Sequence, residues 1–397
     1  MAILSVNCGS SSLKYQLYDW DAQKALASGM IDRIGLKDSN IVHKYNDQKI
    51  ENKGKCPDHK TAFNSILDFL LKEAKLIASL DDIEGVGHRV VHGGEDFSAS
   101  VLIDDVVLAA IKANVDIAPL HNPPNIVGIE SARALMPKTP QVAIFDTAFH
   151  QTIPEYAYTY AITQELARKY KIRKYGFHGS SHRFVSERAV EMLGNKEGLK
   201  VIVVHVGNGS SLSAIKDGKS LDTSMGLTPL AGVIMGTRSG DIDPAIVQFL
   251  AQKLNEPIDK ILNKLNKESG MLGICGFSDQ RDILTGAAQG EEGCALALQM
   301  QAYSMKKYIG AYLAALNGAD AIVFTAGIGE NSSEFRQAVC ENMEALGIEL
   351  DDAKNKDRSS AERVISTGTS RVKILVIPTN EEFIIARDVI ELVRWSK

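Results

Sequence analysis

A glycine-serine turn occurs twice in this chain, as Asn7-Cys8-Gly9-Ser10-Ser11-Ser12 and, about 200 residues later, as Gly207-Asn208-Gly209-Ser210-Ser211. Each copy follows a short apolar run, at residues 3–6 or 201–204, and leads into alternating residues typical of a second strand. Glycine lets the backbone approach an anion closely, and successive N–H groups in such turns form anion-binding concavities. The repeat predicts a duplicated domain that holds a polyphosphate in a cleft between its halves.

The bulk composition is that of a globular enzyme. The chain has 397 residues, of which 45% are hydrophobic and 23% charged, and this length suggests two or three domains. A net charge of -5 argues against a nucleic-acid-binding protein. No apolar run approaches the 18 or so residues of a membrane helix, and no signal peptide is evident. Five widely spaced cysteines without a C-x-x-C pair favour a cytoplasmic location over a disulfide framework.

Strand and helix patterns alternate along the chain, which predicts α/β layers. Residues 141–145 form an apolar run typical of a buried strand, and residues 321–326 form another before a third glycine turn at 327–331. Helical patterns cover residues 61–79, 243–265, 292–316 and 381–394. After residue 150 this order of patterns begins again.

Several charged motifs allow two interpretations each. Arg89, followed shortly by two glycines, suits a carboxylate or phosphate, or it supports a turn. Asp146 closes a buried strand, where α/β folds place ligand groups, or it caps a turn. Arg238 lies in a loop with two acids that also starts a helix at Asp243. Glu381 caps the last helix or holds a divalent cation.

These segments together resemble the acetate kinase family over essentially the whole chain. The resemblance rests on residues 6–14, 88–95, 145–150, 175–182, 205–209, 236–241, 327–331 and 379–382. It implies an α/β fold of two duplicated actin-like ATPase (ribonuclease H-like) domains with a nucleotide cleft between them. The implied N-terminal domain, on the acyl-substrate side, comprises residues 1–148 and 384–397. The implied C-terminal domain, on the nucleotide side, comprises residues 149–383.

The activity implied by the resemblance is reversible transfer of the ATP γ-phosphoryl group to acetate, giving acetyl phosphate and ADP by direct in-line transfer. ATP and ADP are substrates, Mg²⁺ is the cofactor with Mn²⁺ as a substitute, and the enzyme is expected to be a cytoplasmic homodimer. Acetate is already ionised at pH 7, so the protein needs to position and stabilise charge rather than remove a proton.

The resemblance also assigns site residues. The catalytic residues are Asp146, His178 and Arg238, and Asn7 and Glu381 bind the metal. Arg89 binds the acyl carboxylate, and the methyl pocket comprises Val91, Leu120, Phe177 and Pro229. Ser10 and Ser12 belong to the phosphate loop. The nucleotide-binding residues are Lys14, His205, Val206, Gly207, Asn208, Gly209, Asp279, Gln280, Arg281, Gly327, Ile328, Gly329, Glu330 and Asn331. Gln280 departs from the family, which usually has Met or Leu there, and could change the nucleotide preference slightly.

Two alternatives stay open. The nearer one is a propionate or other short-chain fatty-acid kinase of the same family; a side chain as large as Val91 favours acetate, whereas a smaller one would leave room for propionate. The other is a non-metabolic actin-like ATPase switch. Such a switch does not need the carboxylate-binding segment at residues 88–94.

Overall fold

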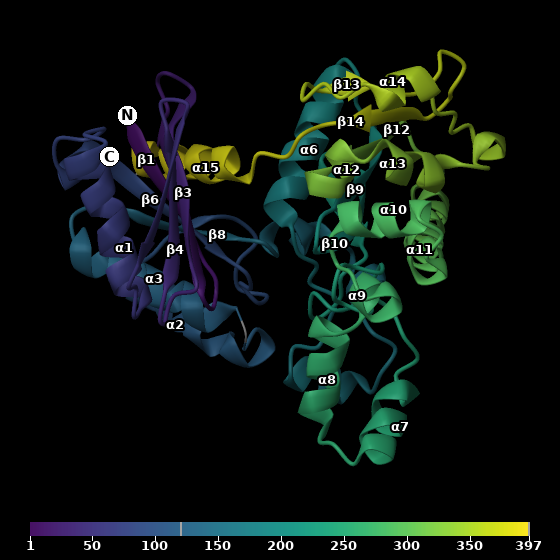
Figure 1. Ribbon diagram of the computed structural model, residues 1–397, viewed down its shortest axis with the longest axis horizontal. Coiled ribbons are helices and arrows are strands. Elements are labelled where there is room, and N and C mark those ends of the chain that lie inside the picture. Colours follow the sequence, from purple (N-terminus) through teal and green to yellow (C-terminus); the bar gives the residue numbers. More distant parts are fainter. Residues whose placement is uncertain (120, 396–397) are drawn as a thin grey trace. The chain divides into compact units, whose positions relative to one another are not determined.

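The computed structural model describes residues 1–119 and 121–395, which form two compact units (Figure 1). Unit 1 contains Met1–Phe149 and the chain from Asn380 onward, and unit 2 contains His150–Thr379. The boundaries expected from the sequence, 148/149 and 383/384, therefore differ from these by one and four residues. Each unit has its own sheet.

The sheet of unit 1 has eight strands in the order β5-β4-β3-β2-β1-β6-β8-β7. The pairs β1–β6 and β6–β8 are parallel, and the other neighbouring pairs are antiparallel. The strands are β1 (Ala2–Cys8), β2 (Ser12–Asp19), β3 (Lys24–Asp32), β4 (Ser39–Tyr45), β5 (Gln48–Gly54), β6 (Ile83–Val90), β7 (Val101–Leu102) and β8 (Gln141–Phe145).

Helices cover both faces of this sheet. The helices are α1 (His59–Asp68), α2 (Asp105–Ala113), α3 (Asn122–Leu135) and α15 (Glu381–Trp395). Strand residues alternate between the faces: Leu4 packs in the cluster that includes Phe63 of α1 and Ala132 of α3, whereas Ile3 packs with α15. Gly87 allows α15 to approach β6, because a Cβ there would lie 2.2 Å from Ile385. The last helix of the chain therefore belongs to the first sheet.

The sheet of unit 2 repeats the core of the first. Its order is β11-β10-β9-β12-β14-β13, and β9–β12 and β12–β14 are parallel whereas β9–β10 and β10–β11 are antiparallel. This matches β3-β2-β1-β6-β8 in order and direction. The strands are β9 (Lys200–Val206), β10 (Ser210–Lys216), β11 (Lys219–Thr223), β12 (Ala321–Thr325), β13 (Arg363–Val364) and β14 (Lys373–Val376). The predicted duplicated fold is confirmed.

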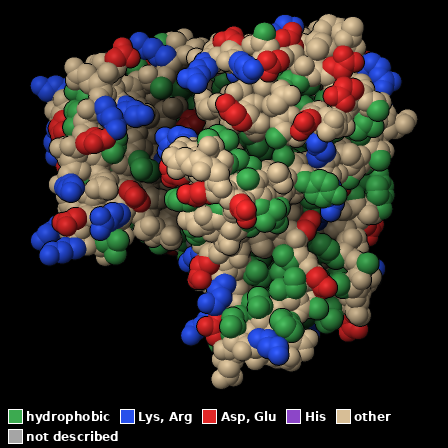
Figure 2. All heavy atoms as spheres, turned by 45° about the vertical axis from the view of Figure 1, so that its right-hand side comes forward, with side chains coloured by type: hydrophobic (Ala, Val, Ile, Leu, Met, Phe, Trp, Pro, Cys, Tyr) green, Lys and Arg blue, Asp and Glu red, His purple; other side chains and the backbone are tan. Residues whose placement is uncertain are grey.

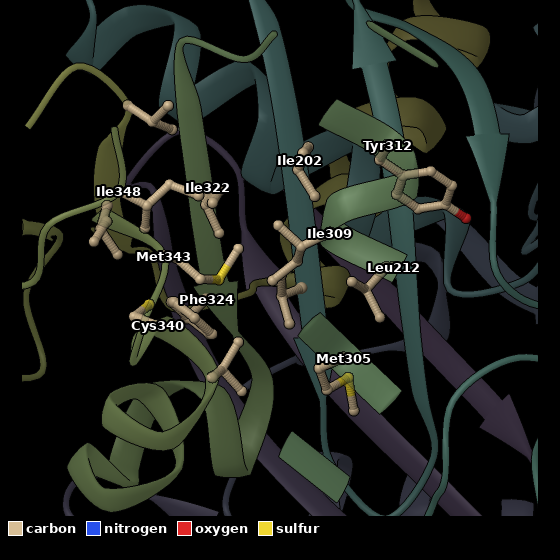
Figure 3. Close-up of a cluster of buried hydrophobic side chains, with 14 of the residues drawn as sticks. Ile202, Leu212, Met305, Ile309, Tyr312, Ile322, Phe324, Cys340, Met343 and Ile348 are labelled. Carbon is tan, nitrogen blue, oxygen red and sulfur yellow. The ribbon is translucent and has the colours of Figure 1, made fainter. Parts of the chain in front are cut away.

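The core of unit 2 lies between the sheet and α11 (Glu292–Leu316) (Figure 3). Ile202, Leu212 and Phe324 from the sheet meet Met305 and Ile309 from the helix, and all five are fully buried. The helix α6 (Gly179–Met192) packs against β9 and β12. Burial on this scale fixes β9 and β10, the two strands that the second glycine-serine turn connects.

Most of the remaining helices of unit 2 lie around its sheet (Figure 1). The helices α7 and α8 lie beyond α9, away from the sheet. They are α4 (Glu155–Tyr158), α5 (Gln164–Lys169), α7 (Ala245–Leu254), α8 (Ile258–Lys267), α9 (Gly270–Cys275), α10 (Gln280–Ala288), α12 (Ala326–Asn331), α13 (Ser333–Cys340) and α14 (Asp352–Lys356). No helix within the described ranges is long and apolar enough to cross a membrane.

Two predicted helices were wrong in extent. The segment 243–265 is divided into α7 and α8, because Asn255 adopts a left-handed conformation (φ 51°) and Pro257 cannot continue the first helix. The segment 61–79 is helical only as far as residue 73, where α1 ends in a π turn at Phe69–Glu73. Lys75 then adopts a positive φ of 50°, which ends the helix.

Candidate active site

The carboxyl ends of the parallel strands in unit 1 hold a buried ion pair. Arg89 near the end of β6 donates from Nε to Asp146 Oδ1 and from Nη2 to Asp146 Oδ2, both at 2.8 Å. Asp146 directly follows β8, and its backbone N–H bonds the carbonyl of Val90. The register pairs Arg89 with Ile144, two residues before Asp146, so the two side chains lie on the same face of the sheet, and the planar guanidinium takes both carboxylate oxygens.

Glu381 adds a second acid to this pair. It is the first residue of α15, and its Oε2 lies 3.4 Å from Arg89 Nη1. Burial opposes the charged form of Arg89, but Asp146 and Glu381 outweigh it and hold the pKa of the guanidinium above its ordinary value. Burial raises the pKa of the Asp146 carboxyl, and Arg89 opposes that shift. Nε and Nη2 of Arg89 are therefore bonded to Asp146, while Nη1 lies toward Glu381.

Two asparagines that the sequence analysis missed hold the segment after β6. Asn125 of α3 accepts from the Val91 N–H at 3.1 Å and donates to the Cys8 carbonyl at 2.7 Å. Asn122 accepts from the His92 N–H at 3.2 Å and donates to the His92 carbonyl at 3.0 Å. Both are almost completely buried. The sequence offered one signal for them, an asparagine on each side of Pro123-Pro124. Once buried, such amides need hydrogen-bond partners, and here the partners are backbone groups.

The first glycine turn links β1 to β2 beside these residues. Gly9 N–H donates to the Ser12 carbonyl at 2.8 Å, and His59 Nε2 donates to the Gly9 carbonyl at 2.7 Å. A Cβ at Gly9 would lie 2.8 Å from Ser12 Oγ, so a larger residue there would displace the Ser12 hydroxyl. Ser10 is exposed, as is Lys14, which is paired with Asn7 in the strand register. The predicted contacts of these side chains with phosphate or metal remain predictions.

In unit 2, hydrogen bonds orient the imidazole of His178. His178 precedes α6 with a φ of 58°, and its Nδ1 lies 2.9 Å from Ser211 Oγ. The same hydroxyl lies 2.7 Å from His182 Nε2. Burial lowers the pKa of His182 well below its ordinary value, so His182 is neutral at pH 7.

The shared hydroxyl determines which nitrogens carry protons. His182 Nδ1 is buried without a partner among the described residues, so a proton on Nε2 leaves no N–H group of this ring unpaired. His182 Nε2 then donates to Ser211, whose single proton goes to His178 Nδ1. In the neutral ring of His178 the proton is therefore on Nε2. His178 also stacks on His205, with centroids 4.3 Å apart, and His205 Nδ1 bonds Ser181 Oγ at 2.8 Å.

Arg238 approaches the same place from another loop. Its Nη1 and His178 Nε2 each lie 3.5 Å from the position that a Cβ at Gly209 would occupy. Arg238 is half-buried, and its Nη1 donates to the Pro229 carbonyl at 3.3 Å and contacts Met235 Sδ at 3.7 Å. No carboxylate among residues 1–119 and 121–395 pairs with it. Burial lowers its pKa, although a guanidinium stays charged at pH 7.

A cavity of about 680 Å³ opens beside the second glycine turn. This volume is within the range of small-molecule sites. It brings together residues from three separate predicted nucleotide motifs, and it adds Ser278, Leu284, Ser332 and Glu334, which the sequence analysis did not select. The predicted residues in its lining are Gly207, Asn208, Asp279, Gln280, Arg281, Gly327, Ile328 and Asn331. His205, Val206, Gly209, Gly329 and Glu330 are not in the lining.

Glu330 instead holds the third turn together. Its Oε1 accepts from the backbone N–H of Ala326 at 2.7 Å and of Thr379 at 3.0 Å. Ala326 has a φ of 64°, which is strained for a residue with a Cβ. The fully buried Arg336 donates to the carbonyls of Gly329 and Glu330, each at 2.9 Å. Glu330 and Arg336 thus fix α12, whose first turn lines the cavity.

The predicted methyl-pocket residues lie in both units. Val91 is a half-buried residue of unit 1, and its backbone is held by Asn125. Phe177 and Pro229 belong to unit 2; the Phe177 carbonyl accepts from His150 Nε2 at 3.0 Å and the Pro229 carbonyl accepts from Arg238. Leu120 lies outside the described residues. The pocket therefore remains a prediction.

The predicted metal ligands fit a magnesium ion that is shared with phosphate. Among the described residues, no group of three or more His, Cys, Asp or Glu side chains could hold a metal ion. Asn7 and Glu381, both in unit 1, offer an amide and a carboxylate oxygen. Magnesium often binds one or two carboxylates together with waters and substrate phosphates, so this small donor set suits it.

Comparisons with known proteins agree with the sequence analysis. A model of the acetokinase family matches residues 2–387. An acetate kinase from Treponema denticola is 54% identical over 398 residues, covering 99% of this chain and 100% of that protein. The chain is also similar to two solved structures, and each match covers 99% of the solved chain. Acetate kinase from Porphyromonas gingivalis is 43% identical, with a TM-score of 0.94 over 99% of this chain. A propionate kinase from Francisella tularensis is 44% identical, with a TM-score of 0.93 over 98% of this chain. The chain therefore belongs to the acetokinase family, whose members are phosphotransferases with a carboxyl group as acceptor.

Proposed function

We propose that this chain catalyses reversible, Mg²⁺-dependent transfer of the ATP γ-phosphoryl group to acetate, giving acetyl phosphate and ADP by direct in-line transfer. The observation that carries the proposal is the half-buried Arg238 guanidinium, which has no carboxylate partner among the described residues and converges with His178 at Gly209. A partly desolvated cation without a partner favours an anionic ligand. A transferring phosphoryl group supplies dispersed negative charge there.

The nucleophile needs no general base, because the acetate carboxylate is already ionised at pH 7. Asp146 is disfavoured as a base or a nucleophile, since Arg89 binds both of its oxygens in a charge-assisted pair. Asp146 therefore orients Arg89 and supports the metal site. Arg89 would use Nη1, the nitrogen not bonded to Asp146, to bind the acyl carboxylate. His178, with its Nε2 proton, and Arg238 would donate to the phosphoryl oxygens.

The nucleotide would occupy the cavity of unit 2. Its lining joins the second glycine turn and the first turn of α12, whose N–H groups suit phosphates, to residues 278–281. Lys14 would contact a nucleotide phosphate. Mg²⁺ would be held by Asn7 and Glu381 together with the phosphates, and when bound it neutralises charge on the polyphosphate.

We also propose a homodimer formed through unit 2. Exposed apolar side chains gather on the lobe that carries α7 and α8 and on the adjoining part of α11 (Figure 2). A surface of this kind commonly marks a protein interface. The exposed residues are Ile246, Phe249, Leu254, Ile258, Leu262, Leu296, Met300 and Tyr303.

A cytoplasmic location is also proposed, because the five cysteines are all free thiols, as is usual in a reducing compartment.

A propionate kinase is the second candidate, because one of the similar structures carries that name. The side chain of Val91 favours acetate over propionate, since it is larger than the alanine or glycine that would make room for another methylene. The ATPase-switch alternative is disfavoured by Arg89, whose segment is held in place by two buried asparagines and has no evident use in a switch.

The direct test is ADP formation from ATP with acetate, measured by chromatography after quenching so that no coupling enzyme is affected by metal removal. We expect turnover that requires both acetate and Mg²⁺, stops in excess chelator and resumes when Mg²⁺ is restored. ADP formation that is independent of any carboxylate would favour the switch. Full activity without a divalent cation would contradict the proposed metal site.

Arg238→Ala should lower kcat by at least roughly 10²-fold while the KM for ATP changes little, because the guanidinium acts mainly on charge that develops in the transition state. Steady-state kinetics with saturating acetate would measure this. Arg358→Ala removes an exposed arginine from the same unit and serves as the control. A near-normal kcat for Arg238→Ala would show that this arginine is structural.

Acetate should be the best substrate, followed by propionate and then butyrate. One methylene changes discrimination by roughly 10- to 200-fold in such pockets. Val91→Ala should shift the kcat/KM ratio toward propionate, whereas Val106→Ala, on the exposed face of α2, should not. If the wild type prefers propionate, or if Val91→Ala leaves the ratio unchanged, the acetate assignment loses its support from this residue.

Light scattering should give twice the chain mass of 43.1 kDa for the wild type. Leu254→Glu on α7 should shift the protein toward monomer, because it places a charge in the apolar patch. Leu166→Glu on α5 is the matched control, since both leucines are 49% exposed. A wild-type monomer at micromolar concentration, or dissociation by both variants alike, would contradict an interface on α7 and α8.

A further inference from the structure

Two buried residues outside the predicted site, Ser211 and His182, are connected to the imidazole of His178. The Ser211 hydroxyl lies between the two rings, 2.9 Å from His178 Nδ1 and 2.7 Å from His182 Nε2. Ser211 and His182 are both 0% exposed. Because bulk water does not reach the shared hydroxyl, the orientation of the His178 ring depends on these two side chains.

The backbone that carries the His178 ring is fixed independently. His150 Nε2 donates to the Phe177 carbonyl at 3.0 Å, and a Cβ at Gly176, where φ is 74°, would lie 2.8 Å from His150 Cδ2. The His178 carbonyl accepts from the His182 N–H at 3.0 Å in the first turn of α6. The freedom left to His178 is therefore the rotation of its ring and the choice of the nitrogen that carries the proton.

Both freedoms affect what His178 presents at its other nitrogen. Its Nε2 and Nη1 of Arg238 each lie 3.5 Å from the position that a Cβ at Gly209 would occupy. Phosphoryl oxygens accept hydrogen bonds, so an Nε2–H group binds them, whereas a bare Nε2 would direct a lone pair at them. A proton donated by the Ser211 hydroxyl to Nδ1 selects the tautomer with Nε2–H, because Nδ1 then has to be an acceptor.

We propose that Ser211 and His182 are positioning residues for phosphoryl transfer, and that they hold the Nε2–H of His178 toward the transferring group. This inference rests on the proposed function in taking His178 as a donor to the phosphoryl oxygens. His182 sets the direction of the hydroxyl, since its Nε2–H occupies the Ser211 oxygen and leaves the hydroxyl proton for His178. Both residues are fully buried, so they act through the ring of His178 and not by contact with a substrate.

Removal of the Ser211 hydroxyl is the first test. Ser211→Ala should lower kcat roughly 5- to 50-fold with little change in the KM for ATP or acetate, because it disorients a donor that acts on charge in the transition state. Ser370→Ala is the matched control, since it removes another buried hydroxyl of unit 2, one that donates to the Val372 carbonyl at 2.6 Å. This control should keep the wild-type kcat.

Substitutions of the two histidines test the route of the effect. A glutamine amide can place an N–H group where His182 Nε2–H lies, whereas leucine cannot, so His182→Gln should retain a higher kcat than His182→Leu. A double-mutant cycle then combines Ser211→Ala with His178→Ala. Once the His178 ring is absent, Ser211→Ala should lower kcat by no more than about 2-fold, because the hydroxyl has no other route to the reaction.

The outcomes separate this inference from the proposed function. If the wild type phosphorylates acetate and Ser211→Ala keeps the wild-type kcat, or lowers it by the same factor with and without His178, the inference is overturned and the proposed function stands. If the wild type transfers the γ-phosphoryl group to water and not to a carboxylate, the proposed function fails. The same cycle, measured as ATP hydrolysis, then tests the inference, and a loss that disappears in His178→Ala supports it.

Discussion

Parallel pairing of three strands in each unit is the constraint on which both polar clusters depend. In unit 1 the ends of β1, β6 and β8 bring the first glycine turn, Arg89 and Asp146 to one edge of the sheet. In unit 2 the ends of β9, β12 and β14 do the same for the second turn, α12 and Thr379. Because strand order and direction are repeated, one structural rule positions residues that have different chemistry.

The two arginines show how different that chemistry is. Arg89 is neutralised by a two-bond pair with Asp146 and by the nearby Glu381, so it can position a carboxylate without leaving an unpaired charge when the substrate departs. Arg238 has no acid partner among the described residues, and its charge is available to a phosphoryl group. The charge-assisted pair with Arg89 also disfavours Asp146 as a nucleophile. Direct transfer between substrates is the mechanism that these contacts favour.

The sequence was informative where a signal was local. The strand at 141–145 and the helix at 292–316 were predicted with the bounds observed, because continuous burial and long helical periodicity leave a clear pattern. The break at Asn255 was missed, although Pro257 follows it, because the apolar periodicity continues across it. The roles of Asn122, Asn125 and Arg336 were also missed. These side chains bond backbone groups of other segments, and a backbone group leaves no signal in the sequence. The pairing of Arg89 with Asp146 likewise depends on strand register, which no local pattern specifies.

The central claim, direct transfer stabilised by Arg238 and His178 without a phosphorylated enzyme, is tested most directly by stereochemistry. ATP made chiral at the γ-phosphorus with three oxygen isotopes would be used to phosphorylate acetate, and the configuration of the transferred group determined. A single in-line displacement inverts the configuration, which is the predicted result. Retention would require two displacements and therefore a phosphorylated residue such as His178, and it would contradict this account.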